Sequence, residues 1–162
     1  KPIQPDYPVL AGQHADYLYK QLKNFKADGG KPAERNNPIM GGMVAALTDQ
    51  DMKNVAAFYA SQTQKGELAK AQAIDAAQKL YRAGDAARGL PACAACHGPA
   101  GAGIPAQYPR IGGQFSEYTE VQLKAFRTGE RGNDPNKTMR AVAAKLSDVE
   151  IKAVSDYVAG LR

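Results

Sequence analysis

The chain has few of the side chains on which most metal sites depend. Its 162 residues contain no tryptophan, two cysteines and two histidines. The chain has one Cys pair but no second Cys pair and no spaced His pair to complete the four ligands of a typical structural zinc site. Any centre built on Cys and His must therefore use these four residues.

Long apolar runs and dense charge runs are also missing. No stretch approaches the roughly 18 apolar residues that a membrane-spanning helix needs. The formal net charge of +5 is spread along the chain without a dense Lys/Arg tract or a nucleic-acid-binding motif. The sequence therefore predicts no membrane span and no nucleic-acid partner. Its start, Lys1-Pro2-Ile3, has no signal-peptide core, so either a leader was removed or the chain is a fragment.

The alternating pattern of a half-buried strand is absent, and helical periodicity takes its place. Ile74, Ala77, Leu80 and Tyr81 fall on one stripe of an amphipathic helix. Further helices are expected at about residues 15–26 and 117–127, and a short helix should carry residues 93–97. The sequence therefore predicts an all-α fold.

The last helix has a clear start signal. It opens with SDVE at residues 147–150, which is a capping-box pattern, and TDQD at Thr48 is a weaker counterpart in the first half. Its expected inner face consists of Ile151, Val154, Tyr157 and Leu161.

The chain consists of two related halves. YPVLAGQHADYLYKQLKNF at residues 7–25 is repeated as YPRIGGQFSEYTEVQLKAF at residues 108–126. A second pair of matching segments spans residues 40–60 and 139–159. The polar residues 61–72 look like the connection between the two units.

Cys93, Cys96 and His97 form the distinctive cluster, in the sequence CAACH. On a helical turn, residues three and four positions apart share a face. Both thiols can therefore form thioethers with the vinyl groups on one edge of a porphyrin, and the histidine can bind the iron. The spacing predicts a covalent c-type haem. Residues 98–114 form a Gly- and Pro-rich loop, and we expect a backbone carbonyl near Pro109 to accept the other ring N–H of the histidine.

Three other interpretations of the cysteine pair are weaker. A thioredoxin-like dithiol belongs with a βαβ pattern, which this sequence does not show. A zinc site would need further Cys or His ligands. A structural disulfide would not need the histidine that follows the second cysteine. The contiguous motif thus favours haem.

A six-coordinate haem needs a second axial ligand. His14 is the only other histidine, and its repeat partner is Phe115, which indicates an ordinary helix-surface residue. Four methionines remain as candidates. Met43 and Met52 are replaced by other apolar residues in the second half, so both are expected in the core.

Met40 and Met139 are the methionines that the repeat retains. Each follows a Pro/Asn-rich stretch, and we expect each to lie in a loop just before a helix. A loop thioether is a common distal ligand in a cytochrome c. Met139 is therefore predicted as the second axial ligand beside His97. Met40 is predicted as a metal ligand only if an upstream first haem segment exists.

Taken together, these features resemble the dihaem cytochrome c4 family. CAACHG is followed by YPRIGGQ, a QLKAFR helix, the methionine and a closing helix led by LSD, and the first half repeats this series without the haem motif. The resemblance covers nearly the whole chain. It implies tandem cytochrome c-like domains and a periplasmic protein, soluble or attached to the membrane surface. It also implies redox protein partners, with an upstream electron donor and a terminal oxidase as acceptor.

The expected organisation is a remnant of a first cytochrome c-like domain at residues 1–62, a linker at 63–73 and a complete haem domain at 74–162. The spacing from Cys93 to Tyr108 would place a first CxxCH before Lys1. Either an upstream segment is absent from this sequence or the protein is a natural one-haem variant. In both cases this sequence can attach one haem c covalently, whereas an intact family member is expected to hold two.

Three hypotheses for the function follow. With His97 and Met139 both on the iron, no position is open for substrate, which predicts an electron carrier and not an enzyme. A haem peroxidase would need a vacant axial position and an acid/base group above it, and the second half has no free histidine to supply one. A dihaem subunit docked to a flavin dehydrogenase, as in a flavocytochrome c, is the third, because such subunits resemble cytochrome c4.

Overall fold

The computed structural model describes residue 2, residues 4–65 and residues 74–162, so most of the expected linker lies outside the described residues. The regular structure of these residues is helical, apart from isolated β-bridges, which confirms the all-α prediction. The helices in order are α1 (Ala15–Phe25), α2 (Pro38–Val44), α3 (Asp49–Ala60), α4 (Ile74–Ala83), η1 (Ala86–Arg88), α5 (Ala94–His97), α6 (Ser116–Thr128), η2 (Pro135–Lys137), α7 (Thr138–Ala143) and α8 (Asp148–Ala159).

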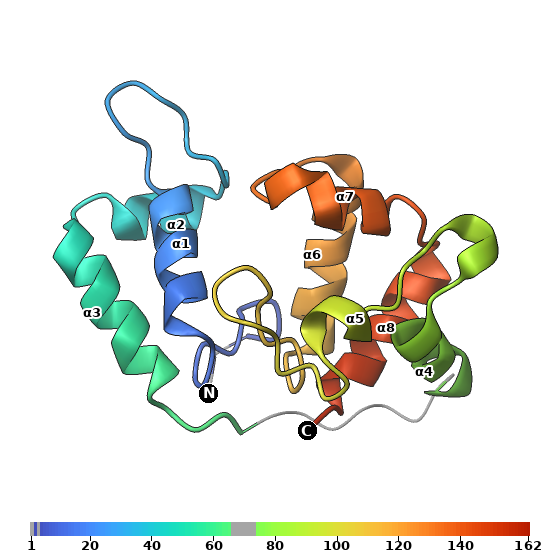
Figure 1. Cartoon of the computed structure of the whole chain (residues 1–162). Coiled ribbons are helices and arrows are strands. Elements are labelled where there is room, and N and C mark those ends of the chain that lie inside the picture. Colours follow the sequence, from blue (N-terminus) through green and yellow to red (C-terminus); the bar gives the residue numbers. More distant parts are fainter. Residues whose placement is uncertain (1, 3, 66–73) are drawn as a thin grey trace.

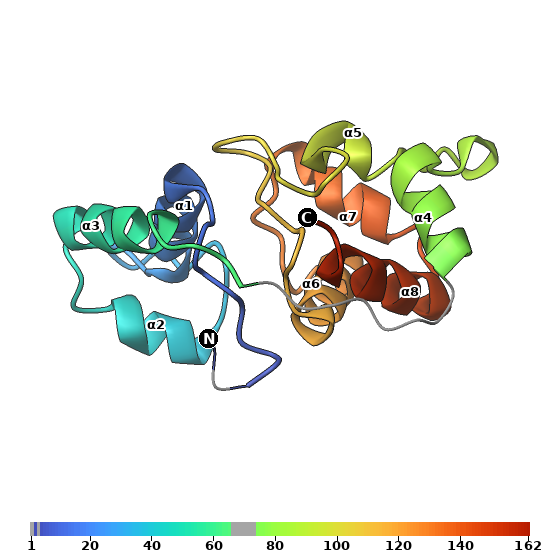
Figure 2. The same ribbon diagram turned by 90° about the horizontal axis from the view of Figure 1, so that it is seen from below.

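The helices form two groups that lie side by side (Figures 1 and 2). In the first unit, α1 packs on α2 and α3. In the second, α8 packs on α4 and α6, and α6 also packs on α7. The series α1–α2–α3 repeats as α6–α7–α8, as the sequence repeat predicts. Helices α4 and α5 have no counterpart among the described residues before position 66.

Both closing helices begin with the same cap. In α8 the Ser147 side chain accepts from the Glu150 N–H, and the Glu150 carboxylate accepts from the Ser147 N–H. Thr48 and Asp51 make the same reciprocal pair at the start of α3. The cap at Thr48, expected to be the weaker one, is thus complete, because an aspartate reaches back as well as a glutamate does. Such a cap typically stabilises a helix by about 1 kcal/mol.

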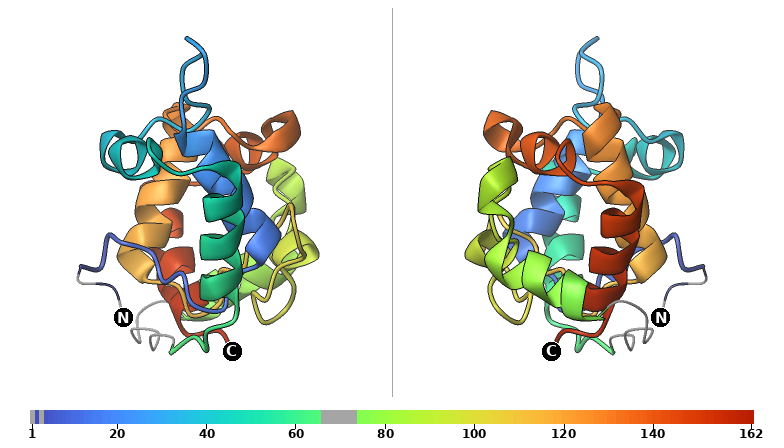
Figure 3. Two further views of the ribbon diagram at one scale, coloured as in Figure 1. Left: turned by 90° about the vertical axis from the view of Figure 1, so that its left-hand side faces the viewer. Right: turned by 90° about the vertical axis from the view of Figure 1, so that its right-hand side faces the viewer.

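The core of the second unit is built on α8. Ala77 and Tyr81 of α4 pack against its inner face, and a second cluster joins Ile151 to Leu123 of α6. Figure 3 shows α4 and α8 side by side on the outer face of this unit. Ile74 was expected on the same stripe but is 40% exposed. It is the first residue of α4, and the buried stripe of that helix begins only one turn later.

The first unit leaves apolar residues exposed that its repeat partner covers. Phe58 is 60% exposed, whereas the equivalent Tyr157 is 9% exposed and lies 5.4 Å from Tyr81, ring centre to ring centre. Met43, expected in the core, is 67% exposed, and that prediction is wrong. Its counterpart Val142 packs beside residues of the segment that precedes α6. The described part of the first unit has no such segment, so Met43 has nothing to pack against.

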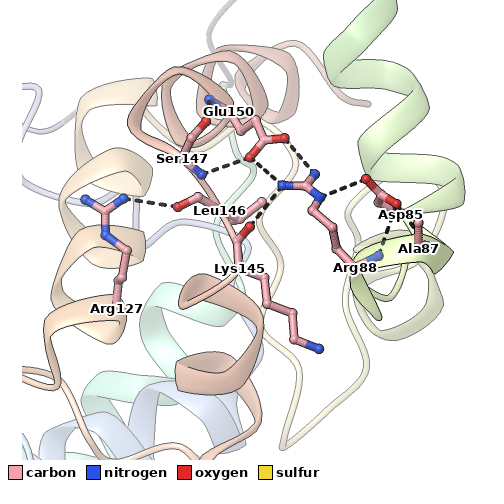
Figure 4. Close-up of polar contacts among 8 residues, drawn as sticks. All are labelled: Asp85, Ala87, Arg88, Arg127, Lys145, Leu146, Ser147 and Glu150. Carbon is pink, nitrogen blue, oxygen red and sulfur yellow. Dashed lines mark hydrogen bonds and ion pairs between the residues drawn. The ribbon is translucent and has the colours of Figure 1, made fainter.

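A polar cluster ties the turn after α4 to the start of α8 (Figure 4). The Arg88 guanidinium donates to both carboxylate oxygens of Glu150, at 2.7 and 3.1 Å. Its Nε also donates to Asp85 at 2.7 Å, and a further N–H donates to the Lys145 carbonyl. These contacts fix η1, and with it the chain that leads into α5.

Candidate haem site

The predicted attachment residues lie on one helical turn. Cys93 has helical backbone angles at the start of α5, and its carbonyl accepts from the Cys96 and His97 N–H groups at 3.3 and 2.9 Å. Both cysteines are half-buried free thiols. The local sequence therefore places two thiols and an imidazole within one turn of helix, as a haem attachment motif requires.

The state of Cys93 argues against a redox dithiol. Burial raises the pKa of its thiol to about 11. Redox-active CxxC cysteines instead have a lowered pKa, because the thiolate is the reactive form. A thioether carries no charge, so an apolar, thiolate-disfavouring position suits a covalent link to a porphyrin.

His97 is oriented for metal binding. Its side chain is buried, and its Nδ1 lies 2.9 Å from the Pro109 carbonyl oxygen, which confirms the predicted acceptor. With Nδ1–H donating to a carbonyl, Nε2 is the ring nitrogen left for iron. Burial also lowers the pKa of His97 and so favours the neutral form that can act as a ligand.

The loop after α5 folds back tightly, so that Gly103 lies against the backbone that carries the Pro109 carbonyl. The Gly103 N–H donates to the His97 carbonyl at 2.8 Å. Gly103 has φ of +73°, and a Cβ placed there would lie 2.4 Å from the Tyr108 oxygen and 2.6 Å from the Pro109 oxygen. Only glycine allows the chain to approach so closely. The glycine-rich composition thus serves to hold the acceptor of His97.

Tyr81 of α4 holds the start of the same loop through a hydrogen bond, a role that the sequence did not show. Its hydroxyl donates to the Gly98 carbonyl at 2.6 Å, and the side chain is fully buried. Burial raises its pKa above the ordinary value, so it remains a neutral donor. The helical stripe predicted a core residue at this position. It could not show where the hydroxyl points.

Met139 lies in the first turn of α7, not in a loop as expected. The helix starts early because Asn136 and Lys137, both with positive φ, turn the chain directly into it. Met139 packs against the cluster that contains Leu123 and Ile151. Figure 2 shows α5 and α7 on the same side of α6 and α8. Ligation by Met139 stays a prediction.

The first unit has the methionine but not the attachment residues. Met40, like Met139, lies in a helix and not in the expected loop: it belongs to α2, where its N–H donates to the Asn37 side chain at 2.9 Å. His14 precedes α1, and its Nε2 lies 2.8 Å from the Ala102 carbonyl oxygen of the second unit. His14 is therefore an interdomain contact and not a partner of Met40.

The donors in residues 74–162 suit haem better than a bare metal ion. Within the described parts of the chain, no three His, Cys, Asp or Glu side chains gather to hold an ion. The His97 imidazole stands beside the thiols of Cys93 and Cys96 on the same turn, which is the set of side chains that covalent haem uses.

Comparison with known proteins gives a consistent result. The Cytochrome c family model matches residues 1–63 and 74–162. The chain is 45% identical over 161 residues to cytochrome c4 of Thiocapsa roseopersicina, covering 98% of this chain and 81% of that protein. It is 39% identical over 160 residues to a thiosulfate dehydrogenase electron acceptor of Stutzerimonas stutzeri, covering 96% and 71%. The crystal structure of reduced recombinant cytochrome c4 from Pseudomonas stutzeri matches with a TM-score of 0.92 at 40% identity, covering 99% of this chain and 87% of that one.

Among the described residues, none of the helices has the length and apolar character needed to cross a bilayer.

Proposed function

This chain belongs to the cytochrome c4 family, and from that premise we propose how its residues carry electrons. The family consists of electron carriers, so the protein is an electron-transfer cytochrome and not an enzyme. We assign the two thioether links to Cys93 and Cys96 and the axial positions to His97 and Met139. The observation that carries this assignment is the buried His97 ring, fixed by Pro109 beside two thiols on the same turn.

A bound haem supplies a one-electron Fe(III)/Fe(II) couple. On the protein side, His97 and Met139 would hold the iron, and the fold would have to keep both side chains in place while the charge of the iron changes. His97 is held by the Pro109 carbonyl and by its own backbone contact with Gly103. Met139 is packed against apolar side chains, and a soft thioether favours Fe(II) and raises the potential.

The attachment can be tested directly. After denaturing electrophoresis, a haem stain should mark the band of the wild-type protein, because a thioether survives denaturation. The double variant Cys93→Ala/Cys96→Ala should lose the stain. Ala95→Ser, an exposed change on the same turn, should keep it. An unstained band from freshly prepared wild-type protein would contradict the assignment.

We place the protein in the periplasm, between an upstream donor and a terminal oxidase. Two curated relatives are named as electron acceptors of thiosulfate dehydrogenases, which supports a dehydrogenase as the donor. A flavin dehydrogenase with a permanently bound cytochrome subunit is the alternative. Stopped-flow reduction by each purified dehydrogenase, followed by reoxidation with oxidase-containing membranes, distinguishes them. A permanent subunit would copurify with its flavoprotein, whereas a carrier would react by collision.

Residues 1–62 fit the remnant of a first cytochrome c-like domain, followed by a linker at 63–73 and the complete haem domain at 74–162. Met43 and Phe58 are exposed apolar residues whose repeat partners are covered by residues 74–97. An upstream segment with its own haem would cover them and would take Met40 as axial ligand. The intact mass of the protein expressed from its gene would count the haems. A mass with a single haem would remove the role of Met40.

A further inference from the structure

We infer that Gln13 of the first unit is a positioning residue for His97 of the second, so that the potential of the second unit's haem depends on the docked first unit. The inference rests on the proposed haem site. Gln13 is 8% exposed and belongs to the segment just before α1. Its side chain reaches into the other unit.

Gln13 grips the backbone of Arg110 at two points. Its Nε2 donates to the Arg110 carbonyl at 2.8 Å, and its Oε1 accepts from the Arg110 N–H at 2.8 Å. A buried amide paired in this way to one residue fixes both the position and the orientation of the backbone there. Oε1 also accepts from the N–H of His14 at 3.0 Å, so the side chain itself is held.

The N–H that is bonded to Gln13 and the carbonyl that is bonded to His97 belong to one peptide group. Arg110 N–H and Pro109 C=O are the two polar ends of the same planar unit. Gln13 Oε1 accepts from one end, and His97 Nδ1 lies 2.9 Å from the other. The peptide cannot rotate away from the imidazole without breaking the contact with Gln13.

The same chain of hydrogen bonds acts on the ligand electronically. Hydrogen bonds in series polarise one another, so a peptide whose N–H is bound becomes a better acceptor at its C=O. A stronger acceptor on Nδ1–H makes the His97 ring a more basic ligand. A more basic ligand stabilises Fe(III) over Fe(II) and lowers the potential. Loss of the Gln13 contact should therefore raise the potential.

His14 adds a second brace on the same loop. Its Nε2 lies 2.8 Å from the Ala102 carbonyl oxygen. The next residue, Gly103, donates to the His97 carbonyl. Two neighbouring side chains of the first unit thus hold both ends of the loop that surrounds the imidazole.

The internal repeat supplies a matched control. Gln114, the repeat partner of Gln13, accepts from the Val9 N–H at 2.8 Å and donates to the Val9 carbonyl at 3.1 Å. It also accepts from the N–H of the residue that follows it, at 3.0 Å. Gln114→Leu therefore removes the same set of contacts between the units. It leaves the peptide on His97 untouched.

The experiment compares Gln13→Leu with Gln114→Leu in the full chain carrying its covalent haem. We expect both variants to lose similar unfolding stability. Only Gln13→Leu should raise the potential of the haem on Cys93 and Cys96 in a spectroelectrochemical titration. Only Gln13→Leu should speed exchange of the His97 Nδ1 proton, followed by NMR. If Gln13→Leu does not fold, Gln13→Asn keeps the amide but withdraws it by one methylene.

The outcomes separate the two proposals. Equal potentials and equal proton exchange in wild type and both variants would overturn the positioning role while leaving the haem site intact. A potential raised equally by both glutamine changes would also overturn it, because the effect would then follow domain docking in general. A protein that attaches no haem would refute the proposed function instead, and the exchange measurement on the haem-free chain would still test the role of Gln13.

Discussion

Arg35 and Arg131 share the same two acceptors across the junction of the units. Each guanidinium donates to the side-chain oxygens of both Gln21 and Gln122, at 2.8 to 3.2 Å. Each guanidinium also donates to a tyrosine hydroxyl of the other unit and lies over the ring of a phenylalanine in its own unit. For Arg35 these partners are Tyr118 and Phe25. For Arg131 they are Tyr17 and Phe126. Among the helices that the structure describes, those of one unit do not pack on those of the other. The junction between the units includes instead a symmetric polar network of long side chains.

Removing both arginines should cost more than the sum of the single changes. Either guanidinium alone can satisfy both glutamine oxygens, and its partner's loss relieves the repulsion of two buried like charges. We expect Arg35→Met and Arg131→Met each to lower the free energy of unfolding by roughly 1.5–3 kcal/mol, the typical worth of a hydrogen bond to a charged group. The double variant should exceed their sum, because both buried oxygens then lose their cationic donors. Urea unfolding of the four proteins in one cycle measures this, and strict additivity would show that the shared acceptors do not couple.

Met139→Ala tests the second axial position. It should abolish the weak red absorbance band of an Fe(III)–Met bond for this haem and lower its potential, because a soft ligand that favours Fe(II) is lost. Met43→Ala is the matched control, since that side chain is 67% exposed and far less constrained. A band and potential that survive in Met139→Ala would rule Met139 out as a ligand.

The haem motif and the helices could be read from the sequence because their signals are local. Cys93, Cys96 and His97 are contiguous, and the cap at Ser147 spans four positions. The contacts of Gln13 could not be read, because a repeated glutamine looks the same whether it serves its own domain or the other one. The repeat misplaced Met43 for a related reason: an apolar counterpart, Val142, shows that the position can be buried in one unit, not that anything covers it in the other.

The equivalence of Arg35 and Arg131 could not be predicted from the sequence repeat, because the loops that carry them differ in length. Arg35 and Arg131 stand at unequal distances from their methionines, so an ungapped repeat does not pair them. The structure pairs them through the backbone, since the Arg35 N–H donates to the Asn24 carbonyl and the Arg131 N–H donates to the equivalent Ala125 carbonyl. The longer loop between α1 and α2 extends away from both units (Figures 1 and 3).

Glu150→Gln should remove part of the protein's acid sensitivity. The Arg88 guanidinium, with help from the Ser147 N–H, lowers the pKa of Glu150 from its ordinary value of 4.5 to about 2. A folded-state pKa below the unfolded value contributes stability that is present above about pH 4.5 and is lost as the pH falls towards 2. The variant should therefore melt at a lower temperature than wild type at neutral pH, and the two melting temperatures should converge near pH 2.

Thermal melts of both proteins across this range provide the test. The effect should be modest, because Glu150 is partly exposed and water screens the ion pair. Glu130→Gln is the control, since this exposed carboxylate has no ion pair among the described residues. If the difference in melting temperature between Glu150→Gln and wild type stayed the same at every pH, the titration of Glu150 beside Arg88 would not contribute to the acid sensitivity.

The first unit should be looser than the second, and α3 and α8 offer a matched comparison. Both helices have 12 residues and complete capping boxes, so their local signals are equivalent. They differ in cover: Phe58 of α3 is 60% exposed, whereas Tyr157 of α8 is 9% exposed. Each Å² of apolar surface removed from water is worth roughly 25 cal/mol, so α3 lacks a stabilisation that α8 has.

Hydrogen exchange of this chain should therefore be faster over residues 7–60 than over residues 74–161. Phe58→Lys should change the exchange rate of the first unit little, because that side chain is already exposed, whereas Tyr157→Lys should unfold the second unit. Equal protection of α3 and α8 in the wild-type chain would mean that the exposed face of the first unit is covered in solution. Adding an upstream segment should then leave the exchange of α3 unchanged.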